Sequence, residues 1–68
     1  MQSIMKRVGA NVKRIRTERG ITQQVLADRT DIHRVYLAQI EGATRAPSLQ
    51  MLERLARALK VSVAALVE

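Results

Sequence analysis

The chain has 68 residues, and its twelve Lys and Arg against six Asp and Glu give a formal net charge of +6. A chain of this length predicts one small domain over residues 1–68 with a thin margin of stability. Because the sequence has no cysteine, disulfides and cysteine-ligated zinc are excluded as further sources of stability. The positive charge favours polyanionic partners, although a basic solvated surface is the plain alternative.

No apolar run approaches the roughly 20 residues needed to span a membrane, and the basic start of the chain lacks the continuous apolar stretch of a signal peptide. We therefore expect a cytoplasmic protein with no membrane partner. Tyr36 is the only aromatic residue. This argues against binding single-stranded nucleic acid, because such sites usually stack bases on several rings.

The chain begins with a predicted amphipathic helix that ends before Gly20, a residue type that commonly terminates helices. Its apolar positions are spaced three and four residues apart and form one stripe: Met5, Val8, Val12 and Ile15. Thr22 is a favourable N-cap for a second, short helix that extends to about Arg29. The residues expected to face inward from this second helix are Leu26, Ala27 and Thr30.

Asp31 and Ile32 form a predicted tight turn between the second helix and a third helix over about 33–41. Two helices joined by so few residues cross closely and steeply. The small side chain of Ala27 suits the point where the third helix approaches the second. The spacing of these residues therefore predicts a compact helix-turn-helix unit over about 23–42.

The third predicted helix has an unusual outward face. At about 100° per residue, Leu37 and Ile40 point to the core. The residues expected at the centre of the opposite arc are Val35, Ala38 and Gln39, with Arg34 and Tyr36 on its flanks. A solvated face poorly explains Val, Ala and Gln at this position. The major groove of DNA suits them, because Arg reads guanine, Gln reads adenine and Val packs against a thymine methyl group.

A loop over residues 42–47 separates the third helix from a fourth, which Ser48 caps and which ends near Lys60. The stripe expected to face the core from this helix is Leu49, Leu52, Leu55, Ala56 and Leu59. Ser62 can cap a last short helix over 63–67. Since no β-alternation persists, we predict an all-α domain of five short helices around one core.

These residues resemble the lambdoid phage repressor and Cro family from about Val8 to Leu66. The resemblance rests on Gln23, Leu26-Ala27, Leu37, Ile40-Glu41, Pro47-Ser48 and Leu49-x-x-Leu52. His33-Arg34-x-Tyr36-Leu37 and Arg45 are similar to the controller proteins of restriction–modification systems. The resemblance implies a five-helix lambda-repressor-like fold. It also implies a homodimeric, sequence-specific regulator that binds a pseudo-palindromic operator in double-stranded DNA and controls its own and a neighbouring gene.

The resemblance further implies roles for individual residues. Base contacts would come from Arg34, Val35, Ala38 and Gln39, and backbone or flanking DNA contacts from Gln23, His33, Tyr36, Thr44 and Arg45. Arg16 and Glu41 would form a partly buried ion pair beneath the third helix. The dimer interface would contain Leu59, Val61, Val63 and Leu66. No cofactor, metal or small-molecule effector is expected.

Two alternatives remain open at the level of sequence. One is a phage repressor or Cro-type regulator, and the other is a DNA-binding antitoxin that acts on a protein partner through Val25 or the last short helix. An enzyme is disfavoured, because the single histidine lacks a catalytic partner pattern and no phosphate loop or metal spacing is present. Asp31 stands where the family usually has glycine, which predicts a left-handed conformation. His33 stands where Ser, Thr or Asp is usual, which predicts a weakly capped third helix.

Overall fold

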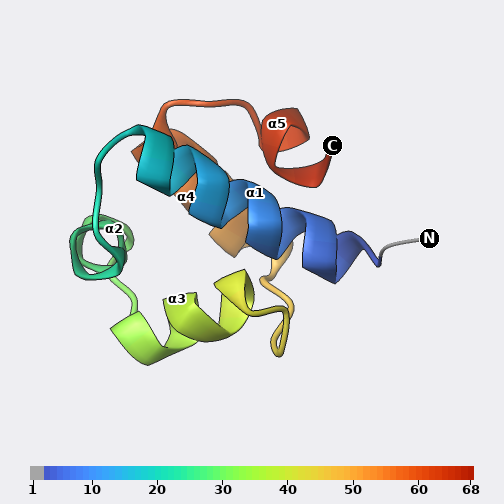
Figure 1. Cartoon of the computed structure of the whole chain (residues 1–68), viewed down its shortest axis with the longest axis horizontal. Helices are drawn as coiled ribbons and strands as arrows, with labels where there is room; N and C mark the ends of the chain where they lie inside the picture. Colours follow the sequence, from blue (N-terminus) through green and yellow to red (C-terminus); the bar gives the residue numbers. More distant parts are fainter. Residues whose placement is uncertain (1–2) are drawn as a thin grey trace.

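The computed structural model describes residues 3–68, which form five helices and no strand (Figure 1). The helices are α1 (Ile4–Glu18), α2 (Gln23–Thr30), α3 (Arg34–Glu41), α4 (Leu49–Leu59) and α5 (Val63–Val67). The predicted five-helix, all-α architecture is confirmed. In Figure 1, α1 crosses the middle of the molecule and packs against α3 on one side, α5 on the other and α4 behind. No helix within residues 3–68 is long and apolar enough to cross a membrane.

Each helix begins at a residue whose side chain accepts a hydrogen bond from a backbone N–H of the first turn. The capping residues are Ser3, Thr22, His33, Ser48 and Ser62. Such caps pair one of the N–H groups that the start of a helix leaves without an intrahelical partner. Five short helices can therefore follow one another closely, because each start is encoded by its own polar side chain.

The core is built from one apolar face of every helix. The largest side chains that are fully buried are Leu26, Leu37, Ile40, Leu55, Leu59, Leu66 and Val12. Thr30 is a polar residue in this core, and its hydroxyl donates a hydrogen bond to the carbonyl oxygen of Leu26 at 2.8 Å. In this arrangement α3 packs against α1 and α2, so the pose of α3 depends on both of these helices.

The buried face of α4 differs from the predicted stripe at its first turn. Leu49 is 69% exposed, whereas Met51 is only 7% exposed. Met51, Leu55 and Leu59 are four residues apart and therefore share a face. Leu49 lies about 120° around the helix from Leu55, at the first residue of α4. The expectation that Leu49 belongs to the core was wrong, and Met51 takes its place.

Candidate nucleic-acid interface

The connection between α2 and α3 is three residues long and closes without glycine. Asp31 has φ 56° and ψ 45°, which confirms the left-handed conformation predicted for it. The Ile32 N–H donates to the carbonyl oxygen of Ala27 at 3.0 Å, a bond typical of a helix that ends at a left-handed residue. Ala27 is fully buried between the two helices. Backbone hydrogen bonds and the small Ala27 side chain thus fix the angle at which α3 leaves α2.

A buried ion pair joins α1 to the end of α3. Arg16 Nε donates to Glu41 Oε2 at 2.7 Å, and Arg16 Nη2 donates to Glu41 Oε1 at 3.0 Å. The pair expected between these residues is therefore present, and it has the two-point geometry that makes such contacts strong. Only 12% of the Arg16 side chain and 3% of the Glu41 side chain are exposed. Arg16 Nη1 also donates to the carbonyl oxygen of Ile21 at 2.8 Å.

Gln23 extends this network to α2. Its side-chain Nε2 donates to Glu41 Oε1 at 3.1 Å. The side chain that the family resemblance assigns to a DNA phosphate is therefore held against α3 in the unbound protein. Arg16, Gln23 and Glu41, which we call the platform network, connect α1, α2 and α3. The network fixes α3 without occupying the outward face of that helix.

Gly9 allows α1 to approach the end of α3 closely, a role that the sequence analysis did not identify. A Cβ atom at this position would lie 2.4 Å from the carbonyl oxygen of Ile40 and 2.8 Å from that of Glu41. Both are backbone atoms, so the contact cannot be relieved by rotating a side chain. The one available signal in the sequence is a glycine inside a helical pattern, which often marks close packing.

On the outward face of α3, the side chains of the first turn are the most exposed. Arg34 is exposed and Val35 is 51% exposed, as predicted for residues that meet a partner. Tyr36, Ala38 and Gln39 are only partly exposed. Ala38 and Gln39 therefore do not point fully away from the protein as expected. The following loop folds back on this end of α3, where the Thr44 N–H donates to the Gln39 carbonyl oxygen at 3.0 Å.

The loop after α3 places a second arginine beside the helix. The Arg45 guanidinium lies 5.1 Å from the centre of the Tyr36 ring, within cation–π range. Thr44 and Arg45 are both exposed. Arg34, Val35, Tyr36 and Arg45, which we call the α3 surface, combine two fixed positive charges with an apolar and an aromatic side chain.

His33 caps α3, which corrects the expectation of a weak cap. Its Nδ1 atom accepts a hydrogen bond from the Val35 N–H at 3.1 Å. The residue is exposed and lies at the boundary between the turn and the α3 surface. An imidazole can perform this role because its neutral form has one ring nitrogen that accepts a hydrogen bond.

Two of the four residues expected in a dimer interface are buried within the protomer. Leu59 is 1% exposed and Leu66 is 0% exposed, so neither side chain can contact a partner, and these two assignments were wrong. The reason is that α5 folds back on α1, where Asn11 Nδ2 donates to the Leu66 carbonyl oxygen at 3.0 Å. Val61 and Val63 also pack on the core but keep part of their surface exposed.

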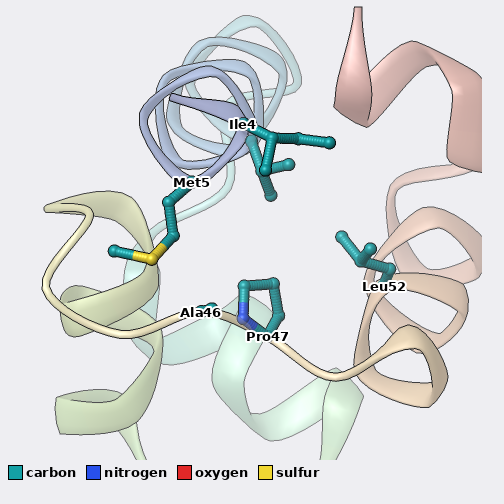
Figure 2. Close-up of a pocket in the computed structure, with 6 residues that line it drawn as sticks. Ile4, Met5, Ala46, Pro47 and Leu52 are labelled. Atoms are coloured by element: carbon teal, nitrogen blue, oxygen red, sulfur yellow. The ribbon is translucent and has the colours of Figure 1, made fainter. Parts of the chain in front are cut away.

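A small apolar pocket lies between the start of α1, the loop after α3 and α4 (Figure 2). Ile4 and Leu52 lie on two sides of it and Pro47 below, and Met5, Val8 and Ala46 complete the lining. Its volume is about 90 Å³, well below the roughly 300–1,000 Å³ of pockets that hold small-molecule ligands. The α3 surface, rather than this pocket, is therefore the candidate functional site.

Comparisons with known proteins support the same assignment. The Helix-turn-helix family model matches residues 12–66. The immunity repressor protein of Bacillus phage phi105 is 47% identical over 60 residues, which cover 88% of this chain and 42% of the repressor. The chain thus spans less than half the length of that relative. Control protein C.BamHI from Bacillus amyloliquefaciens is 39% identical over 54 residues, or 78% of this chain and 67% of that protein.

Among solved structures, the restriction-modification controller protein C.AhdI from Aeromonas hydrophila superposes with a TM-score of 0.88 at 29% sequence identity. The match covers 91% of this chain and 94% of the controller protein. The similarity therefore extends well beyond the α2–α3 unit. The chain belongs to the helix-turn-helix family and is similar to a phage repressor and to restriction–modification controller proteins.

Proposed function

We propose that the protein is a homodimer that binds a pseudo-palindromic operator in double-stranded DNA, with α3 of each protomer in the major groove. The observation that carries this proposal is the exposure of Arg34 and Val35 at the first turn of α3. In helix-turn-helix proteins the N-terminal residues of the second helix contact base edges. The platform network holds this helix from below, so its exposed side chains meet DNA in one fixed pose.

The residues of the α3 surface suit different parts of the DNA. The Arg34 guanidinium suits the O6 and N7 atoms of guanine, and Val35 suits a thymine methyl group. Arg45, held over the Tyr36 ring, is placed for a phosphate or a flanking base. Thr44 and the backbone N–H groups at the start of α2 add phosphate contacts. Gln23 Nε2 gives one N–H to Glu41 Oε1, so its second N–H and the backbone N–H are the donors that a phosphate would meet.

A two-fold dimer places its two recognition helices about 34 Å apart, one turn of DNA. Val61 and Val63 are the residues of the expected interface that retain exposed surface, and they support a contact near the start of α5. The named relatives include both controller proteins and a phage repressor. We propose the controller role, in which the protein regulates its own and a neighbouring gene, with a phage repressor role as the alternative. Footprinting on DNA upstream of its own gene distinguishes these roles from a regulator that acts only elsewhere.

The variant Arg34→Ala tests the proposed docking. We expect it to lower the ratio of specific to random-sequence binding about five- to 150-fold, or ~1–3 kcal/mol, and to relax base preference at one position. The matched control is Arg14→Ala, which removes the same charge from the side of α1 about 160° away from Arg16. Titrations with duplexes selected from a random library measure both ratios. Equal discrimination by Arg34→Ala and the wild type would exclude the proposed role of α3.

A further inference from the structure

The cap of α3 is an imidazole, a side chain that accepts a hydrogen bond only in its neutral form. The His33 Nδ1 atom can accept the Val35 N–H only while it carries no proton, which places the ring proton on Nε2. Among described residues this is the one hydrogen bond of the His33 ring. The other four helices are capped by hydroxyl groups, which do not titrate near neutral pH. The helix that carries Arg34 and Val35 is therefore the only one with a proton-sensitive start.

We propose that His33 is a positioning residue that couples DNA discrimination to pH, an inference that rests on the function proposed above. Protonation of Nδ1 replaces an acceptor with a donor, so the bond to the Val35 N–H is lost. The resulting positive charge also opposes the positive end of the α3 dipole. The first turn of α3 then loosens, and Arg34 and Val35 lose the fixed positions that base readout requires.

The surroundings of His33 offer no charged group that replaces the cap. Asp31 and Arg34 flank it in the chain, and both are exposed. On α2, Asp28 Oδ1 already accepts a hydrogen bond from Gln24, and Arg29 is exposed. On α1, Arg16 is committed to Glu41 at the other end of α3. None of these groups forms an ion pair with His33 among the described residues, and DNA phosphate is the anion that the protonated imidazole would meet in the proposed complex.

Protonation of His33 has two opposite effects on DNA binding. Binding to random-sequence DNA and the preference for selected DNA report them separately. The added positive charge strengthens contacts with phosphates, which carry no sequence information. The lost cap weakens base readout. As the pH falls from 8 to 5.5, binding to random-sequence duplexes should rise, whereas the ratio of selected to random binding should fall about fivefold per bound protomer. This factor corresponds to the ~1 kcal/mol that a helix cap contributes.

The experiment compares the wild type with His33→Asn and His33→Ala on duplexes selected from a random library at pH 8. Asparagine caps helices well and does not titrate here, so His33→Asn should keep its discrimination at every pH. His33→Ala has no cap and should discriminate poorly and uniformly. A wild-type ratio that does not change with pH, or a His33→Asn ratio that falls as much as the wild type, would overturn the proposal.

A second readout separates this proposal from the function on which it rests. Nitrogen-15 NMR of the DNA-free protein reports which ring nitrogen carries the proton, and it follows the Val35 amide during the titration. We expect an unprotonated Nδ1 at pH 8 and a Val35 amide shift that tracks the imidazole. If the protein prefers no duplex at pH 8, the proposed function fails. The NMR measurement still shows whether the His33 ring accepts the Val35 N–H. A Val35 amide shift that stays constant while the His33 ring gains its proton would refute the hydrogen bond between them.

Discussion

Replacing Gly9 by alanine should destabilise the protein, although alanine favours a helix by about 1 kcal/mol over glycine. The new Cβ atom would lie 2.4 Å from the Ile40 carbonyl oxygen, whereas ordinary contacts begin near 3.4 Å. Relief of this contact requires α1 and α3 to separate by about 1 Å, since both atoms are fixed to backbone. Overpacking of this kind costs about 1–3 kcal/mol.

The separation also strains the platform network, because Glu41 follows Ile40 directly and its carboxylate is held by Arg16. A hydrogen bond to a charged group contributes about 1.5–3 kcal/mol in full, so its partial weakening costs about 1 kcal/mol. With the gain in helix propensity subtracted, the net loss for Gly9→Ala is about 2 kcal/mol. For a domain of this size that loss lowers the Tm by about 8–16 °C.

Urea and thermal unfolding followed by circular dichroism measure this change. The matched control is Ala10→Gly, because Ala10 is the next residue of α1 and is exposed. It should lose about 1 kcal/mol through helix propensity alone. A Gly9→Ala variant as stable as the wild type, or more stable, would show that α1 and α3 do not meet as closely as the structure has them.

Four further substitutions test the platform network, the loop after α3 and the core by the same unfolding measurements. Arg16→Ala leaves Glu41 buried without its charge partner and should cost about 3–5 kcal/mol, a large share of the stability of so small a domain. A loss below 1 kcal/mol would contradict the burial of the pair. Ala43→Gly should stabilise by about 1 kcal/mol, because Ala43 has a φ of 60° that glycine adopts freely. Lower stability than the wild type would count against that loop conformation. Leu49→Gln should change the free energy of unfolding by less than about 0.5 kcal/mol, whereas Met51→Ala should lower it by about 2–5 kcal/mol. A larger loss for Leu49→Gln than for Met51→Ala would show that Leu49, and not Met51, belongs to the core.

The sequence predicts the helices well because their signals are local. Apolar spacing marks the buried face of α1, and Thr22, Ser48 and Ser62 mark three helix starts that the structure confirms. The left-handed turn at Asp31 was likewise predicted, because Asp31 stands where the family that the sequence resembles usually has glycine. Each of these features depends on residues within about one helical turn of one another.

Features that depend on distant packing were less predictable. Leu59 and Leu66 are apolar residues near the end of the chain, and their pattern suits a dimer interface as well as a core. Only the return of α5 onto α1 assigns them to the core. Gly9 shows the same limit, because its close contact is with Ile40, 31 residues later in the chain. The α3 surface itself was predictable at Arg34 and Val35, where helical periodicity alone decides exposure.

The arrangement of supports around α3 has a consequence for how this regulator can change its DNA target. The end of α3 is held by Glu41 and the platform network, and its start is held by His33. None of these contacts uses the side chains of Arg34 or Val35. If the proposed function holds, substitutions at those two positions should alter base preference with little effect on stability, because exposed side chains contribute little to folding. Substitutions in the supports should instead reduce discrimination for every operator together.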